Sequence, residues 1–121
     1  MELNQLAIKQ AKEGLRNKKF SYVELTKACL DQIKKIDKSI NAFITVCEKE
    51  ALKAAKKADE LASQGDAWRD MPLLGIPIAL KDLFLTKGIR TTAASKVLDN
   101  FIPVYDATVV KKLKEKGAII I

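Results

Sequence analysis

The sequence predicts an α/β fold in which helices come first and buried strands follow. Apolar residues recur at helical spacing over residues 1–70, which indicates amphipathic helices. After Pro72 this periodicity gives way to short apolar runs broken by Gly and Pro, a pattern typical of buried strands in a sheet covered by helices. A length of 121 residues with 48% hydrophobic content suits one domain. We therefore expect one unit, 1–121, that is mainly helical over 1–70 and strand-rich over 71–121.

Two amphipathic helices are expected at the start of the chain. The first runs from about Leu3 to Asn17 and stops in "RNKKF". The second begins at "SYVE", where the Ser21 hydroxyl accepts from the backbone of Glu24 and the Glu24 carboxylate reaches back, forming a capping box. This second helix is expected to end near Asp37. Its buried stripe consists of Tyr22, Leu25, Cys29, Ile33 and Ile36.

A strand and a third helix are expected between residues 41 and 65. The stretch "INAFITVC" is short, β-branched and aromatic, which favours a strand from Asn41 to Val46. A helix with a closely packing face of small residues follows, and Gly65 is placed to end it. That face consists of Ala51, Leu52, Ala55, Ala58, Leu61 and Ala62. The next residues, "QGDAWRDMP", are expected to form a loop.

The second half is expected to alternate short strands with turns. "IPIAL" is predicted as a buried strand, "GIRTT" as another extended piece, and "AASKVLDN" as a helical turn or loop. Asp106 is expected to cap a helix that Gly117 terminates. The sequence then ends in "AIII", a buried-type strand for which it offers no later partner. We therefore expect a part of a longer protein, with an exposed edge strand that favours self-association.

The net charge of +7 does not by itself indicate a nucleic-acid interface. Nineteen of the 22 basic residues are lysines, and they are scattered over predicted polar helix faces, as on solvated surfaces. No long apolar stretch indicates a signal peptide or a membrane span, so we expect a cytoplasmic protein. Neither nucleic acid nor a membrane is therefore an expected direct partner.

Histidine is absent, and its absence excludes several kinds of catalytic centre. Ser-His-Asp triads, Cys-His pairs and His-Glu-x-x-His zinc sites all require it. Cys29 and Cys47 have neither metal nor redox spacing, so no metal or cofactor is expected on this chain, and Cys29 is assigned to the core. Cys47 lies near a predicted helix start, where a thiolate is favoured, but no histidine is available to activate it. Lysine remains as the candidate base.

Lys81 is the candidate catalytic residue. The stretch "LLGIPIALKDLF" carries an apolar run straight into a Lys-Asp pair. Burial lowers the pKa of a lysine towards neutrality, and α/β proteins gather reactive groups at the ends of their central strands. The alternative, and the commoner case at a strand end, is a lysine whose ammonium group simply reaches solvent. Asp82 is expected to stabilise the turn after Lys81 or to pair with a nearby donor.

Three motifs, "GIPIALKD", "KGIRTTAAS" and "YDATVV", occur in this order, and together they resemble the opening of the amidase signature family. The preceding "KKFSYVELTKACLDQIKKIDKSINAFITVCEKEALKAAKKADE" is similar in particular to the glutaminase subunit of tRNA-dependent amidotransferases. The resemblance covers almost the whole chain. It implies the N-terminal helices and first strands of a mixed sheet that is surrounded by helices and built from a chain several times longer.

The resemblance also implies a role for Lys81. The family hydrolyses amides with a Ser–cis-Ser–Lys triad, whose lysine closes "GIPIALKD" and exchanges protons with the bridging serine, which in turn activates the nucleophile. Both serines belong to a Gly/Ser-rich segment that follows in the family. Ser95 is expected to support the site, and no serine of this chain has a "GGSS"-like context; the four are Ser21, Ser39, Ser63 and Ser95. We therefore expect no ammonia release from glutamine by this chain alone.

The substrates and partners implied by the resemblance are those of an amidotransferase. They are glutamine or another small amide, and the B and C subunits of that complex, with ATP and Mg bound by one of these partners and not by this chain. Two alternatives stay open. One is a part of a stand-alone amidase of the same family, and the other is a non-catalytic binding or assembly module.

Overall fold

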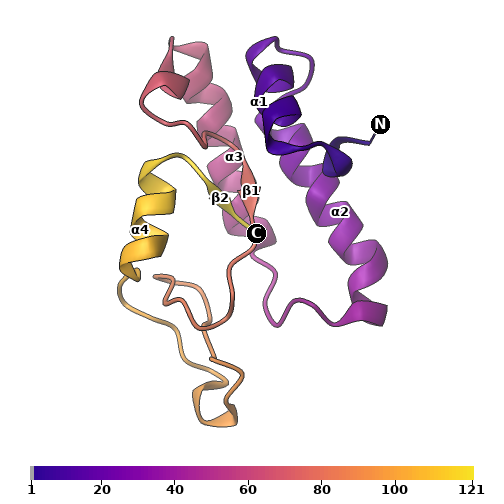
Figure 1. Ribbon diagram of the computed structural model, residues 1–121. Helices are drawn as coiled ribbons and strands as arrows, with labels where there is room; N and C mark the ends of the chain where they lie inside the picture. Colours follow the sequence, from indigo (N-terminus) through magenta and orange to yellow (C-terminus); the bar gives the residue numbers. More distant parts are fainter. Residues whose placement is uncertain (1) are drawn as a thin grey trace.

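The computed structural model describes residues 2–121, in which helices precede strands as the α/β prediction requires (Figure 1). The α-helices are α1 (Ile8–Arg16), α2 (Tyr22–Ile40), α3 (Glu48–Ser63) and α4 (Thr108–Glu115). The strands are β1 (Pro77–Ile78) and β2 (Ile119–Ile120), and the 3-10 turns are η1 (Leu3–Gln5), η2 (Ala67–Arg69) and η3 (Lys96–Leu98). Helix α2 packs against α3, β2 lies against α3, and residues 79–107 extend away from these helices.

The first predicted helix is divided into two pieces. The chain is extended at Ala7, with φ −64° and ψ 154°, so that η1 and α1 are separate. The Gln10 side chain accepts a hydrogen bond from the Ala7 N–H at 2.9 Å, and it thereby satisfies a donor at the start of α1. The helix stops within "RNKKF" as predicted, where Lys18 is left-handed with φ +53°.

The capping box that begins α2 is confirmed. The Ser21 hydroxyl accepts from the Glu24 N–H at 3.0 Å, and the Glu24 carboxylate accepts from the Ser21 N–H at 2.7 Å. Asp59 of α3 adds a cap from outside the helix, because its carboxylate accepts from the N–H groups of Tyr22 and Val23 at 3.0 and 3.2 Å. These contacts satisfy the free N–H groups of the first turn and fix α2 to α3.

The predicted strand from Asn41 to Val46 is wrong, because this segment is irregular. Helix α2 continues past the expected end at Asp37 to Ile40, and Asn41 stops it in the left-handed conformation with φ +55°. The Asp37 carboxylate then accepts from the N–H groups of residues 42 and 43 at 2.8 and 3.3 Å, which holds the segment as a turn. No strand lies beside it within residues 2–121, so its β-propensity has no ladder to join.

Helix α3 has the small-residue face that the sequence predicts. Ala51, Ala55 and Ala58 are buried, and they allow close packing on α2 and on β2. The helix ends at Ser63, and Gly65 takes a positive φ of +140°. The predicted loop that follows contains the short turn η2.

Strand β2 has a partner, which corrects the expectation of an unpaired C-terminal strand. It pairs in parallel with β1, and the Ile119 N–H donates to the carbonyl of Ile76 at 2.9 Å while the Ile121 N–H donates to that of Ile78 at 3.1 Å. The Ile119 side chain is only 2% exposed. The predicted strand "IPIAL" is therefore real but short, since only its first residues form the ladder.

The segment between β1 and β2 differs from its predicted elements in two places. "GIRTT" is not a strand, and only its Ile89 forms an isolated antiparallel bridge, with Thr86 before it. "AASKVLDN" contains the expected helical turn, η3. Asp106 does not cap α4; its carboxylate accepts from the Lys87 N–H at 2.7 Å and from the Lys114 ammonium at 3.0 and 3.1 Å. Gly117, with φ +90°, follows the end of α4 as predicted.

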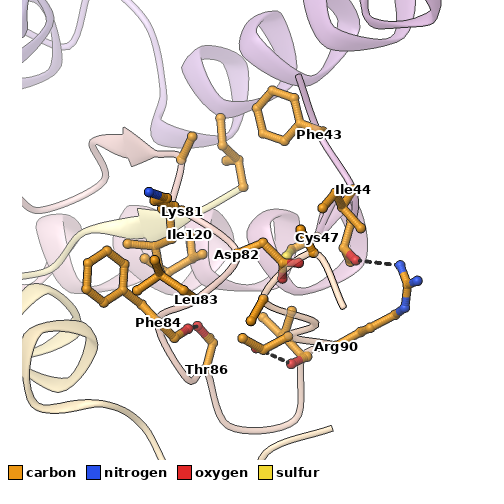
Figure 2. Close-up of a pocket in the computed structure, with 18 of the residues that line it drawn as sticks. Phe43, Ile44, Cys47, Lys81, Asp82, Leu83, Phe84, Thr86, Arg90 and Ile120 are labelled. Atoms are coloured by element: carbon orange, nitrogen blue, oxygen red, sulfur yellow. Dashed lines mark hydrogen bonds between the residues drawn. The ribbon is translucent and has the colours of Figure 1, made fainter. Parts of the chain in front are cut away.

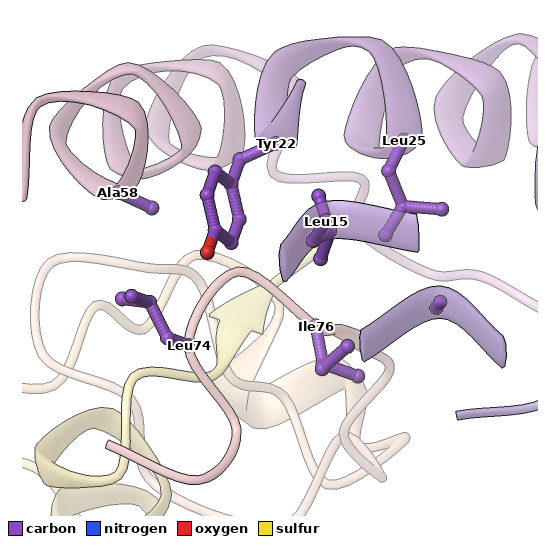
Figure 3. Packing of buried hydrophobic residues seen from close by; sticks show 7 residues of the cluster. Leu15, Tyr22, Leu25, Ala58, Leu74 and Ile76 are labelled. Carbon is purple, nitrogen blue, oxygen red and sulfur yellow. The ribbon is translucent and has the colours of Figure 1, made fainter. Parts of the chain in front are cut away.

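The main core cluster joins the helices to the residues that lead into β1 (Figure 3). It consists of Ala11, Leu15, Tyr22, Leu25, Ala58, Leu74 and Ile76. Gly75 lies in this cluster at φ +71°, where a Cβ atom would stand 1.7 Å from Cδ1 of the Tyr22 ring. A second cluster of Leu30, Ala51, Ala55 and Ile119 lies between α2, α3 and β2. Both clusters fix the entrance to β1, and hence the start of the segment that carries Lys81.

Candidate active site

Lys81 lies three residues after the end of β1, at the start of a tight turn. Its carbonyl accepts hydrogen bonds from the N–H groups of Leu83 and Phe84 at 2.8 and 3.1 Å. The residue is exposed in this chain, so the dry environment expected for a catalytic lysine is not formed by residues 2–121. Any burial of the Lys81 ammonium group has to come from another polypeptide segment.

Lys81 lines a pocket of about 450 Å³ (Figure 2). Three separate stretches form it: residues 42–47 before α3, residues 79–94 after β1, and the end of β2. Much of the lining is apolar, with Phe43, Leu83, Phe84 and Ile120 among its side chains. The pocket therefore combines an amine, a carboxylate at Asp82 and an apolar wall, as is typical of sites for small molecules.

Asp82 joins the start and the end of the 79–94 stretch of the pocket by hydrogen bonds. Its carboxylate accepts from the Thr92 N–H at 2.9 Å and also from the Thr92 hydroxyl, and its carbonyl accepts from the Ala93 N–H at 2.6 Å. Burial acts to raise the pKa of this carboxyl, but the hydrogen bonds from Thr92 and the Ala94 backbone outweigh it. With the nearby charge of Arg90, they hold the pKa of Asp82 below its ordinary value. The expectation that Asp82 pairs with a nearby donor is confirmed.

The loop that supplies these donors contains two left-handed alanines. Ala93 and Ala94 have φ values of +50° and +55°, a region that residues with a Cβ atom rarely occupy. Thr91 and Thr92, which precede them, are 4% and 3% exposed. Thr92, which bonds to both Asp82 and Ala94, thus anchors a strained turn beside Lys81. The two left-handed positions are alanines, so no glycine in the sequence indicates this turn.

Arg90 joins two walls of the pocket. Its guanidinium contacts both the carbonyl and the carboxylate of Asp99, the latter at 2.5 Å, and donates to the Thr45 hydroxyl at 3.3 Å. Reasoning from the sequence does not single out Arg90 or Thr92. The one available signal is their place in "KGIRTTAAS", the motif that follows the lysine.

None of the four serines lines the pocket that holds Lys81. Ser21 caps α2, as predicted. The hydroxyls of Ser39 and Ser63 donate to carbonyl groups three residues earlier, at 2.8 and 2.6 Å. Ser95 begins the turn η3, next to the pocket but outside its lining. Residues 2–121 thus contain a candidate base without a nucleophilic serine beside it.

Cys47 also lines the pocket, at the N-cap of α3 as expected. Burial raises the pKa of the Cys47 thiol above its ordinary value; Glu50 raises it further, and Lys114 opposes them, so the helix start does not favour a thiolate. Burial likewise raises the pKa of Cys29, which is half-buried on α2. Among the described residues, no group of His, Cys, Asp or Glu side chains is arranged to hold a metal ion. No helix in the described part of the chain is long and apolar enough to cross a membrane.

Comparison with known protein families places the chain in one of them. A sequence model of the Amidase family matches residues 24–121, and the chain belongs to that family. The resemblance to the amidase signature family is thereby confirmed.

Individual relatives show which kind of Amidase-family protein the chain resembles. The chain is 54% identical over 121 residues to the A subunit of the glutamyl-tRNA(Gln) amidotransferase of Geobacter metallireducens, and 49% identical to that of Desulfatibacillum aliphaticivorans. Each match covers the whole chain but only 24% of the relative. The chain therefore resembles the N-terminal part of this A subunit, and it spans about a quarter of the relative's length.

Solved structures confirm the fold. A peptide amidase in complex with the inhibitor chymostatin superposes with a TM-score of 0.91 at 27% identity, covering all of this chain and 25% of that one. An amidase family protein from Bacillus anthracis superposes with a TM-score of 0.83 at 32% identity, covering 99% of this chain and 24% of that one. The arrangement of helices, β1 and β2 is thus that of the first part of an amidase signature fold.

Proposed function

We propose that this chain supplies the catalytic lysine to the glutaminase subunit of a cytoplasmic, tRNA-dependent amidotransferase. That enzyme releases ammonia from glutamine and uses it to convert Glu-tRNA(Gln) to Gln-tRNA(Gln). The observation that carries the proposal is the position of Lys81. It lies just beyond a strand of a parallel pair, in a pocket with an apolar wall, within a chain 54% identical to an amidotransferase A subunit.

In the proposed mechanism, Lys81 moves a proton. Its neutral amine accepts a proton from a bridging serine, which in turn takes the proton of a nucleophilic serine as that oxygen attacks the amide carbonyl. The proton then passes back through the bridging serine to the amide nitrogen, which leaves as ammonia when the carbon–nitrogen bond breaks, and the acyl group stays on the nucleophilic serine. Water hydrolyses this ester, which releases the acid and restores the serine hydroxyl. In the family, both serines belong to a Gly/Ser-rich segment that comes later in the chain than the lysine motif. Burial by that segment would exclude water from the Lys81 amine and complete the site.

The exposed apolar side chains between β1 and α4 support docking of a further polypeptide segment. Seven large apolar side chains are exposed between residues 83 and 105: Leu83, Phe84, Val97, Phe101, Ile102, Val104 and Tyr105. An apolar surface of this kind is typical of an interface. In the proposed complex the rest of the glutaminase subunit covers this surface, the B and C subunits assemble on the whole, and ATP and Mg are used by one of these partners.

Reconstitution tests the proposal. The chain is mixed with a separately produced polypeptide containing the remaining three quarters of the Geobacter metallireducens relative, and glutamate and ammonia are measured after addition of glutamine. We expect neither component to release ammonia alone and the mixture to do so. Turnover by the 121-residue chain alone would contradict the proposal. A cooperatively folded chain that does not bind the second polypeptide would favour a binding or assembly module.

A stand-alone amidase is the second candidate. The close superposition on a peptide amidase favours it, but at 27% identity that relative is much more distant than the amidotransferase sequences. The pocket around Lys81 suits both functions, so binding to the B and C subunits has to distinguish the amidotransferase from the stand-alone amidase. Co-purification of the reconstituted protein with the B and C subunits is expected for the amidotransferase, whereas an active protein that ignores them would be a stand-alone amidase.

A further inference from the structure

We propose that Asp82 and Thr92 are positioning residues for Lys81, which they hold in place by clamping residues 81–83 to the turn at 92–95. This inference rests on the proposed function of Lys81. The clamp consists of three hydrogen bonds: two from Thr92 to the Asp82 carboxylate, and one from the Ala93 N–H to the Asp82 carbonyl. A carboxylate and a carbonyl of one residue thus engage consecutive residues of another segment, which fixes the register of the two segments.

The local geometry makes the clamp act on the backbone next to Lys81. The Asp82 carbonyl accepts a hydrogen bond from the Ala93 N–H. The Lys81 carbonyl accepts from the N–H groups of the two residues after Asp82. The peptide unit between Asp82 and Leu83 is therefore constrained on both sides, because its carbonyl accepts from the Ala93 N–H and its own N–H donates to the Lys81 carbonyl. The clamp thus holds the backbone next to Lys81, while Lys81 itself is exposed.

The strained backbone of the turn at 92–95 indicates that the contacts around it hold it firmly. Two consecutive alanines adopt left-handed conformations, and such strain persists only where surrounding contacts determine the backbone. Thr92 supplies those contacts, because its hydroxyl donates to Asp82 and also accepts from the Ala94 N–H at 3.2 Å. With the Thr92 side chain 3% exposed, water has little access to replace these bonds.

Thr91 offers a matched control next to Thr92. It is equally buried at 4%, but its hydroxyl donates to the carbonyl of Ile89, two residues earlier, and makes no bond to Asp82. Replacing either threonine with valine removes one buried hydroxyl and keeps the branched shape. A general loss of packing or stability would affect both variants, whereas loss of the clamp would affect only Thr92→Val.

The test uses wild-type chain, Thr92→Val, Thr92→Ser and Thr91→Val, each reconstituted with the remainder of the glutaminase subunit. We expect Thr92→Val to lower kcat for glutamine about 10- to 100-fold with little change in KM, since misplacement of a reacting group costs rate more than binding. Thr92→Ser, which retains the hydroxyl, should recover most of that loss. Thr91 lines the pocket but makes no bond to Asp82, so the loss in Thr92→Val should exceed any loss in Thr91→Val by at least about tenfold. Equal kcat for Thr92→Val and Thr91→Val would overturn the proposal.

Amide hydrogen exchange on the chains without the second polypeptide separates this proposal from the proposed function. In Thr92→Val the Ala93 N–H should exchange about tenfold or more faster than in wild type, and in Thr91→Val it should not. Unchanged exchange at Ala93 would overturn the clamp whatever the activity. An inactive wild-type mixture would instead refute the proposed function. The hydrogen-exchange result could then still show the clamp, but the clamp would have no role in catalysis.

Discussion

Gly75 should be among the least replaceable residues of this fold, and Gly88 provides its control. Both have similar positive φ values, +71° and +76°. A Cβ atom at Gly75 would stand 1.7 Å from Cδ1 of the buried Tyr22 ring, whereas a Cβ atom at Gly88 would meet nothing within 4 Å. The pair Gly75→Ala and Gly88→Ala therefore separates the cost of backbone strain from the cost of displacing a core side chain.

The expected magnitudes follow from these contacts. A residue with a Cβ atom in the left-handed region costs about 1–2 kcal/mol, and this is the whole penalty expected for Gly88→Ala. Overpacking a core adds about 1–3 kcal/mol, so Gly75→Ala should lower the free energy of unfolding by about 2–5 kcal/mol. The difference arises at Tyr22, which also begins α2 and contacts the core cluster below β1.

Urea unfolding followed by the helical circular dichroism signal measures both variants. Comparison of midpoints requires equal slopes, which would show that the same surface is exposed on unfolding. We expect Gly75→Ala to unfold at a clearly lower urea concentration than Gly88→Ala. If the two free energies agreed within about 0.5 kcal/mol, the proposed packing of Tyr22 on Gly75 would be refuted.

Two further predictions concern carboxylates. Asp59→Ala removes the acceptor for two N–H groups at the start of α2, and it should cost about 1–3 kcal/mol in urea unfolding; an effect below about 0.5 kcal/mol would contradict the cap. The pKa values of Asp82 and Asp106 are lowered in the folded chain, so their stabilisation is present above the ordinary carboxyl pKa of about 3.9 and is lost as pH falls through the lowered values. Asp106→Asn should therefore be less stable than wild type at neutral pH and lose less stability on acidification, and an unchanged acid titration followed by circular dichroism would contradict this.

Features encoded by neighbouring residues were predictable from the sequence. The Ser21–Glu24 capping box needs only a spacing of three residues, and Gly117 needs only the backbone freedom of glycine. The helices α2 and α3 follow from apolar spacing in the same way. These local signals were sufficient to predict the four α-helices and the α/β class.

Features that depend on distant residues were not predictable. The strand expected from Asn41 to Val46 fails because the Asp37 carboxylate holds the backbone and no second strand lies alongside within residues 2–121. Asp106 fails as a cap because its carboxylate bonds to Lys87 and Lys114 instead. In each case a specific hydrogen bond outweighs a general propensity.

The candidate site shows the same division. Lys81 was found from an apolar run that ends in a Lys-Asp pair, but its exposure depends on whatever covers the pocket. The pairing of Asp82 with Thr92 joins residues ten positions apart. The left-handed conformation at positions 93 and 94 occurs at alanines, so no glycine in the sequence indicates it. The sequence thus pointed to Lys81 as the candidate base, whereas the structure was needed to find the residues that bond to its neighbour Asp82.

The central claim is that Lys81 is the base of an amide-hydrolysing site, and a comparison of two lysines tests it most directly. Lys81→Met and Lys96→Met each replace an exposed lysine with an unbranched apolar side chain, and only Lys81 lines the pocket. Each variant is reconstituted with the remainder of the glutaminase subunit, and glutamate formation from glutamine is measured. We expect Lys81→Met to lose at least about 100-fold in kcat, within the range of general-base catalysis, and Lys96→Met to match wild type. Equal activity of the two variants in an active mixture would contradict the assignment of Lys81.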